Sequence, residues 1–117
     1  MNQADTIVAL ATPAGVGAIG IIRLSGPEAI AIANSAFKGK DLAKQVSHTI
    51  HFGHIVDGDA VLDEVLASIF IAPRSYTGEH VVEISCHGSA YILESVIKLL
   101  MKKGARAAKP LAGEDVC

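Results

Sequence analysis

The chain has 117 residues and a formal net charge of −2, with 10 Lys and Arg residues against 12 Asp and Glu residues. This length fits a single domain, residues 1–117, and the slight acidity excludes the strongly basic face that binding to a nucleic-acid backbone requires. Half of the residues are hydrophobic, yet only five are Phe or Tyr and none is Trp, so the core must consist of Ile, Val, Leu and Ala.

The N-terminal half predicts two strands and a helix. The strands cover residues 6–11 and 19–24, two apolar runs rich in Ile and Val that flank the turn-forming segment TPAGVG. The sequence SGPE at residues 25–28 begins a helix, because Pro suits the first turn and an acid there complements the helix dipole. Its apolar stripe, at i, i+3 and i+7, consists of Ile30, Ala33 and Phe37. Gly39 is expected to end this helix.

The C-terminal half predicts three strands and a second helix. Residues 49–56 and 61–72 flank Asp57-Gly58, a strong signal for a hairpin of antiparallel strands. The run VVEISC forms a further strand, and the helical period returns over residues 89–103 until Gly104. The predicted order is β-β-α-β-β-β-α: an α+β fold with a mixed, mainly antiparallel sheet and two principal helices.

Three glycines after the first strand, Gly15, Gly17 and Gly20, spell G-x-G-x-x-G, the pattern of dinucleotide-binding loops. In such a loop the glycines open a helix, whereas here they lead into IIRL, which is a β-type sequence. A hairpin turn explains them better, and a dinucleotide-binding fragment is kept as a less favoured alternative. The chain has no G-x-x-x-x-G-K-[ST], so it contains no P-loop that would cradle a nucleotide.

The apolar content is high for so small a body, with a mean hydropathy of +0.42. A short domain cannot hide all of this surface, which favours a partner surface on a second copy or a following domain over an Ala-rich monomer. The start MNQADTIVAL lacks the features of a signal peptide, and no apolar run approaches membrane-spanning length. With only two cysteines as well, we expect a cytoplasmic protein that does not enter a membrane.

Two charged residues stand inside apolar strands. Arg23 alternates with Ile19 and Ile21, and Glu83 alternates with Val81 and Ser85. A charge at such a position needs a partner or water, because burying it alone costs several kcal/mol. The residues alone favour a structural explanation, in which Arg23 and Glu83 pair with each other or each side chain reaches water from a sheet edge. The functional alternative is a polar ligand, with Arg23 binding a carboxylate or phosphate and Glu83 accepting N–H bonds from a heterocycle.

Cys86-His87, with further histidines at 48, 51, 54 and 80, raises the possibility of a metal site or a nucleophile. Histidines at i, i+3 and i+6 on a strand point to alternating faces, and no second cysteine pair completes a zinc pattern. We therefore expect no metal site. Cys86 is expected to be a small buried core residue rather than a catalytic thiolate, so no catalytic residue is assigned.

Four segments in the same order and nearly the same spacing resemble the N-terminal domain of the MnmE (TrmE) tRNA-modification GTPases. They are DTIVALATP, GVGAIGIIRLSG, the PRSYTGE loop and VVEISCHGS. The likeness covers about the first 105 residues by pattern matching. It implies a fold related to the folate-binding half-domains of one-carbon enzymes. Such a domain forms a homodimer and holds a tetrahydrofolate derivative of the 5-formyl type at or near the dimer interface.

In that family the positions matching Arg23 and Glu83 contact the folate, which gives the two charges a shared explanation. The resemblance further implies that the parent protein, with an FAD-containing partner, places a carboxymethylaminomethyl-type group on the wobble uridine of certain tRNAs. The folate would supply the one-carbon unit, and GTP hydrolysis would drive conformational change. GTP, Mg²⁺ and K⁺ would bind in a GTPase domain that these 117 residues do not include.

The tail departs from the family pattern. After Lys109-Pro110 the family continues in a Gly-Glu-Phe motif and then a lysine that also touches folate, whereas this chain reads LAGEDVC. The folate site is therefore expected to be only partly present, and Cys117 is not equated with the family's C-terminal cysteine. We expect a reduced-folate-binding dimerisation domain. The alternative is a pure dimerisation module without a ligand, in which Arg23 and Glu83 form a structural pair.

Overall fold

The computed structural model describes residues 5–11, 19–75 and 78–108 of the chain. Within these residues one sheet of seven strands has the order β3-β4-β5-β6-β2-β1-β7. The strands are β1 Ile7–Leu10, β2 Ile19–Ser25, β3 Phe37–Lys38, β4 Thr49–Asp57, β5 Ala60–Phe70, β6 Val81–His87 and β7 Arg106–Ala107. The helices are α1 Ala29–Ala36 and α2 Ala90–Lys102, with a short 3₁₀ turn, η1, at Leu42–Lys44.

The pairing of the strands confirms the predicted fold class. Five of the six neighbouring pairs are antiparallel, and only β1 with β7 is parallel. The hairpin at Asp57-Gly58 is present, with Asp57 opposite Ala60 across a two-residue turn. The segment TPAGVG lies outside the described residues, but the antiparallel pairing of β1 with β2 agrees with the predicted hairpin.

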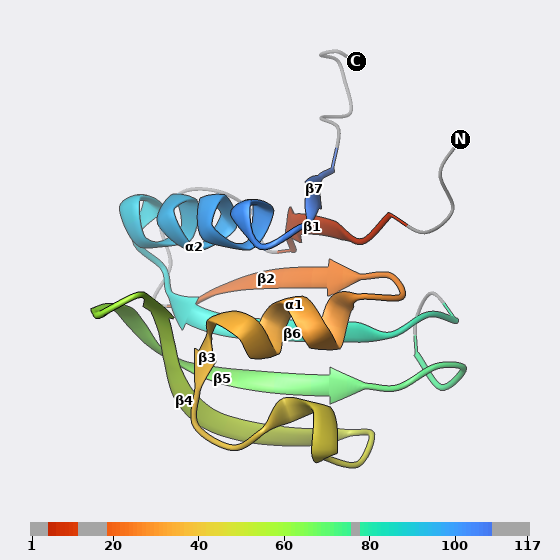
Figure 1. Ribbon diagram of the computed structural model, residues 1–117. Coiled ribbons are helices and arrows are strands. Elements are labelled where there is room, and N and C mark those ends of the chain that lie inside the picture. Colours follow the sequence, from red (N-terminus) through yellow and green to blue (C-terminus); the bar gives the residue numbers. More distant parts are fainter. Residues whose placement is uncertain (1–4, 12–18, 76–77, 109–117) are drawn as a thin grey trace.

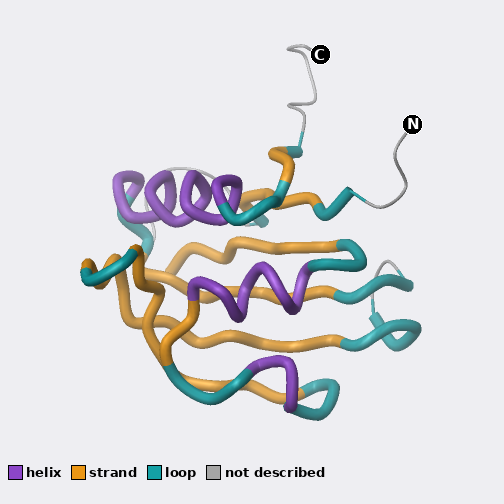
Figure 2. The backbone as a smooth tube through the Cα atoms, in the orientation of Figure 1, coloured by secondary structure: helices purple, strands orange, loops and turns teal. Residues whose placement is uncertain are grey.

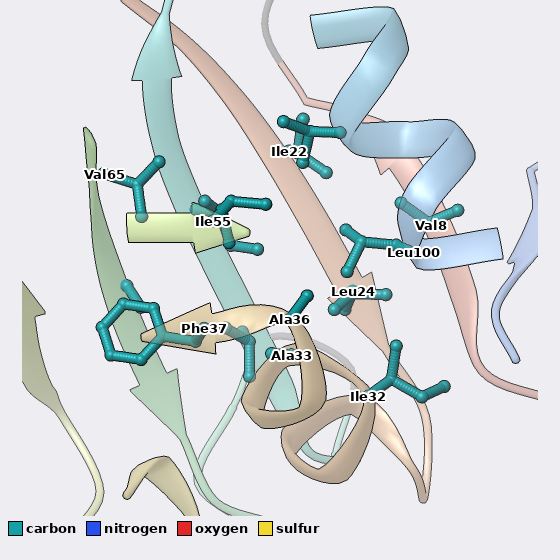
Figure 3. Close-up of a cluster of buried hydrophobic side chains, with 14 of the residues drawn as sticks. Val8, Ile22, Leu24, Ile32, Ala33, Ala36, Phe37, Ile55, Val65 and Leu100 are labelled. Atoms are coloured by element: carbon teal, nitrogen blue, oxygen red, sulfur yellow. The ribbon is translucent and has the colours of Figure 1, made fainter. Parts of the chain in front are cut away.

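Both helices pack on the same face of the sheet, as Figure 1 shows. Alternate residues of the strands point toward them; Ile22 and Leu24 of β2 and Ile84 of β6 are completely buried there. Figure 3 shows Ile22 and Leu24 near Ile32 of α1 and Leu100 of α2, and Ile84 belongs to the same core cluster. The core is built mainly from Ile, Val, Leu and Ala, as the composition requires, together with Phe37 and Cys86.

The first helix ends earlier than the sequence predicts. It stops at Ala36, so Phe37 is not part of its stripe and Gly39 does not end it. Phe37 instead adopts an extended backbone and begins β3, opposite Ile55. Its ring fills the space left by Gly53, where an added Cβ would lie 2.3 Å from Phe37 Cζ. Packing against the sheet therefore overrides the helical period at this residue.

The second helix matches its prediction closely. Ser89 caps it by accepting a hydrogen bond from the Ile92 N–H group, and Leu93 and Leu100 are buried on its inner face. It packs tightly on β2, since a Cβ at Gly20 would lie 2.7 Å from the Leu93 methyl groups. Gly104 follows the last turn with φ +125°, a conformation that other residues rarely adopt.

The strand β2 also tests whether the three glycines form a dinucleotide-binding loop. A dinucleotide-binding loop would lead into a helix at Ile21, but Ile21 lies in the middle of β2, between β1 and β6. That alternative is therefore wrong. Among the described residues, no helix has the length and apolar character needed to cross a bilayer.

Candidate functional site

The face of the sheet opposite the helices carries the charged residues that the sequence singled out. We call it the open face, because neither helix packs on it. Arg23 of β2 and Glu83 of β6 are directly opposite each other in the antiparallel register, although 60 residues separate them in sequence. Their neighbours Ile22 and Ile84 point into the core, so side-chain alternation places both charges on the open face.

The two side chains form an ion pair. Arg23 Nε donates to Glu83 Oε2 at 2.8 Å, and Arg23 Nη2 lies 2.7 Å from the same oxygen. The Arg23 side chain is 40% exposed and that of Glu83 is 17% exposed. Within the described chain Oε1 of Glu83 has no such contact, so the carboxylate keeps an acceptor for a further donor. The two charges thus neutralise each other, and the pair still presents polar atoms to solvent.

Beyond this pair, the start of β6 and the end of β2 lie next to residues 71–75 and 78–80. Ser25 Oγ lies 3.4 Å from Glu79 Oε1, and the His80 ring accepts a hydrogen bond from the Ala72 N–H group at 3.1 Å. A hollow of about 320 Å³ opens there, between Pro27 and residues 72 and 78–80. Thr77 of the predicted TGE loop lies outside the described residues. Figure 2 shows the described parts of the connection between β5 and β6 at one end of the sheet.

The other end of β6 carries a second polar pair. His87 Nδ1 lies 2.6 Å from Asp63 Oδ1, and the His87 backbone N–H donates to Asp63 Oδ2 at 2.7 Å. The Asp63 side chain is 6% exposed, whereas that of His87 is 65% exposed. Sequence reasoning treated His87 only as a metal ligand or part of a nucleophile and did not consider Asp63. The available signal was a carboxylate, Asp63, within the apolar run of β5.

A hollow of about 410 Å³ adjoins His87 on this side of the molecule. Its apolar residues include Ile19, Phe52 and Leu66, all of which are more than 40% exposed. Ile50, which is 64% exposed on the same face, extends this apolar end of the sheet toward the ion pair, because it pairs with Ser68 and Ser68 pairs with Glu83. This is the exposed hydrophobic surface that the composition predicts.

Cys86 is confirmed as a buried core residue, only 3% exposed. Burial, followed by the nearby Asp63 carboxylate, raises the pKa of its thiol from 9.0 to about 12. A thiol that stays protonated is a poor nucleophile. In the described ranges no three His, Cys, Asp or Glu side chains converge in a way that could hold a metal ion.

Comparison with known proteins identifies the family of the chain. A profile of the family described as "GTP-binding protein TrmE N-terminus" matches residues 6–114. The chain belongs to this family. The TrmE N-terminal match covers all the described elements, including both strands that carry the ion pair.

Relatives of this TrmE N-terminal domain carry the name "tRNA modification GTPase MnmE". The chain is 60% identical to the protein from Flavobacterium johnsoniae over 97% of its own length, and 58% identical to that from Christiangramia forsetii, also over 97%. It is 53% identical to the Streptococcus thermophilus protein over 93% of its length. In each case it spans 24% of the relative, about a quarter of that protein.

Proposed function

We propose that this TrmE N-terminal domain binds a reduced folate of the 5-formyl-tetrahydrofolate type and dimerises the GTPase to which it belongs. The observation that carries the proposal is the Arg23–Glu83 pair at the centre of the open face. The family resemblance assigns folate contacts to these two positions. They meet as cross-strand neighbours on a surface that neither helix covers.

The chemistry of the pair suits such a ligand. A pterin ring presents an edge of N–H donors and a carbonyl oxygen. Glu83 offers a carboxylate oxygen to N–H donors, and the guanidinium of Arg23 donates to carbonyl or carboxylate oxygens. Because each charge already neutralises the other, the site does not need a charged ligand to be stable, and its selectivity comes from matched donors and acceptors.

The apolar end of the open face supports dimerisation. Ile19, Ile50 and Phe52 are each more than 60% exposed, and an apolar cluster of this kind is typical of an interaction surface. A second copy packed on these residues would remove them from water and enclose the open face. The ligand would then lie at or near the interface, as the resemblance implies.

For the whole protein we propose the activity in its relatives' names, modification of tRNA by a GTPase. The modification would be of the carboxymethylaminomethyl type at the wobble uridine, made with an FAD-containing partner in the cytoplasm. GTP, Mg²⁺ and K⁺ would bind outside these 117 residues, since the chain contains no P-loop sequence. The folate bound at Arg23 and Glu83 would supply the one-carbon unit.

Calorimetric titration with 5-formyltetrahydrofolate tests the folate proposal. The unmodified chain should bind, and Arg23→Ala and Glu83→Ala should each weaken binding about tenfold or more, the usual effect of losing a charge-assisted hydrogen bond. The pair Glu94 and Lys98 on α2, 3.4 Å apart and well exposed, supplies matched control variants that should bind normally. Equal binding by all variants would show that the ligand does not use the Arg23–Glu83 pair.

A pure dimerisation module is the second candidate, favoured by the fact that Arg23 and Glu83 already satisfy each other. Light scattering combined with the folate titration separates the two functions. Both predict a dimer that Phe52→Glu dissociates, but only the folate-binding domain also binds 5-formyltetrahydrofolate. A dimer without any folate affinity would establish the second candidate.

A further inference from the structure

One side of α2 carries four polar or aromatic side chains in a single row. The α2 row consists of Tyr91, Ser95, Lys98 and Lys102. These positions stand at i, i+4, i+7 and i+11, so they share one face of the helix. Tyr91 is 78% exposed and the side chain of Lys98 is 73% exposed. The row therefore lies beside the buried face of α2 and is accessible to a partner.

A hollow of about 300 Å³ lies between the α2 row and the β4–β5 hairpin. All four members of the row line it, and Asp57 and Leu62 of the hairpin form its other side. Leu99, which is buried, contributes an apolar floor. A volume at the lower end of the range for ligand pockets admits one ring with its substituents. Because α2 packs on the other face of the sheet, this hollow is separate from the open face.

The charge of the hollow is positive on balance. Lys98 and Lys102 bring two ammonium groups, and Asp57 brings one carboxylate. Glu94 lies 3.4 Å from Lys98, but an exposed pair of this kind is weak, so Lys98 can exchange it for a better acceptor. Among the described residues Lys102 forms no ion pair. Two lysines at one hollow favour an anion, and a phosphate group has oxygens for both.

Tyr91 gives the hollow an aromatic wall. In the described part of the chain no other ring packs on it. An exposed aromatic ring beside basic residues is a typical platform on which an unpaired base stacks. Ser95 Oγ donates to the Tyr91 carbonyl at 2.8 Å and keeps its lone pairs as acceptors. With the carboxylate of Asp57, it can accept from a ribose 2′-hydroxyl or from the amino group of a base.

We propose that the hollow between α2 and the β4–β5 hairpin binds one unpaired nucleotide of the tRNA that the whole protein modifies. The phosphate lies against Lys98 and Lys102, and the base stacks on Tyr91. The nucleotide must be unpaired, because a base inside a duplex is stacked and cannot reach an aromatic side chain. This inference rests on the proposed tRNA modification and not on the folate site. A single contact of this kind supplements binding elsewhere, in agreement with a chain that has no strongly basic face.

Nuclear magnetic resonance of the ¹⁵N-labelled chain during titration with a tRNA transcript tests this site. The amide signals of the α2 row should shift, with a dissociation constant of about 0.1 mM, as for weak nucleic-acid contacts. Lys98→Gln combined with Lys102→Gln should weaken binding about tenfold and reduce the slope of log affinity against log salt by about 1.4. Tyr91→Ala should weaken binding about tenfold and leave the slope unchanged, because it removes stacking but no charge.

The matched control is Lys40→Gln combined with Lys44→Gln. It makes the same charge change at two exposed lysines beside and within η1, neither of which lines the hollow. This variant should bind tRNA with the affinity and salt slope of the unmodified chain. Two further probes identify the ligand. A fully paired RNA duplex should not shift the Tyr91 signal, and uridine monophosphate should bind more weakly than tRNA.

The outcomes separate this inference from the proposed function. If tRNA shifts no signal of the α2 row, or if the lysine and tyrosine variants bind it like the control, the site is refuted. Tighter binding of uridine monophosphate would assign the hollow to a free nucleotide and overturn the inference. Shifts that depend on the concentration of the chain and not on RNA would indicate a protein contact, which also overturns it.

The whole protein provides the remaining distinction. Tyr91→Ala and the double lysine variant should raise its KM for tRNA. A protein that modifies tRNA with an unchanged KM in these variants would refute the site and leave the function standing. A protein that does not modify tRNA would refute the proposed function itself.

Discussion

Breaking the Arg23–Glu83 pair should destabilise the chain unequally, depending on which partner is removed. Arg23→Ala leaves a carboxylate that is only 17% exposed without its partner, and we expect a loss of about 2 kcal/mol. Glu83→Ala leaves a guanidinium that is 40% exposed and can be hydrated, so the loss should be about 1 kcal/mol. The coupling energy of the pair should be about 1 kcal/mol, at the upper end of the range for exposed ion pairs, because the pair is partly buried.

Urea unfolding of the chain, both single variants and the double variant gives these values directly. The Glu94–Lys98 pair on α2, with side chains 68% and 73% exposed, is the control and should show about 0.3 kcal/mol. A coupling energy for Arg23 and Glu83 no larger than that of the control would contradict the reasoning. It would mean that the pair does not hold in solution and that both charges are free to bind other groups.

Three further perturbations test the fold around the site. Cys86 should resist iodoacetamide at pH 8 in the folded chain and react when unfolded, as seen by mass spectrometry of a Cys117→Ser variant, because its thiol titrates near 12. Since the folded pKa lies above the ordinary 9.0, the stability that the protonated thiol contributes is complete below pH 9 and is lost as the pH rises toward 12. Alkaline unfolding should therefore show a loss of about 1.4 kcal/mol per pH unit in that window relative to Cys86→Ala, and an identical pH dependence would refute it. Gly53→Ala should destabilise by about 1–3 kcal/mol because its methyl group would meet the Phe37 ring, and the companion change Phe37→Leu should recover part of the loss in thermal unfolding. Gly104→Ala, at φ +125°, should cost about 1 kcal/mol, and an unchanged melting temperature would show that α2 does not need this conformation.

The elements that carry the site were predictable because their residues alternate. In β2 and β6 apolar residues repeat every second position, and this pattern indicated both the strands and the unusual place of Arg23 and Glu83. The sequence also favoured a pair between them on charge alone, and the structure confirms that pair. It could not predict the register that makes them cross-strand neighbours, because 60 residues separate them and strand order is decided by packing.

The parts that sequence reasoning missed depend on tertiary contacts. The strands β3 and β7 have two residues each, too few to show a period, and they exist only through pairing with β4 and β1. Phe37 fits the period of the preceding helix. The gap that receives its ring is created by Gly53 on another strand, so the local sequence could not predict its place in β3. Asp63 was overlooked because its partner His87 comes from another strand, and a single acid in an apolar run does not identify its partner.

A crystal structure of the chain with 5-formyltetrahydrofolate tests the central proposal most directly. The account predicts ligand density on the open face of the sheet, with polar contacts to Arg23 and Glu83, next to a two-fold axis that brings a second copy against the apolar end. Ligand density elsewhere, or an open face covered by a second copy with Arg23 and Glu83 bound only to each other, would contradict it.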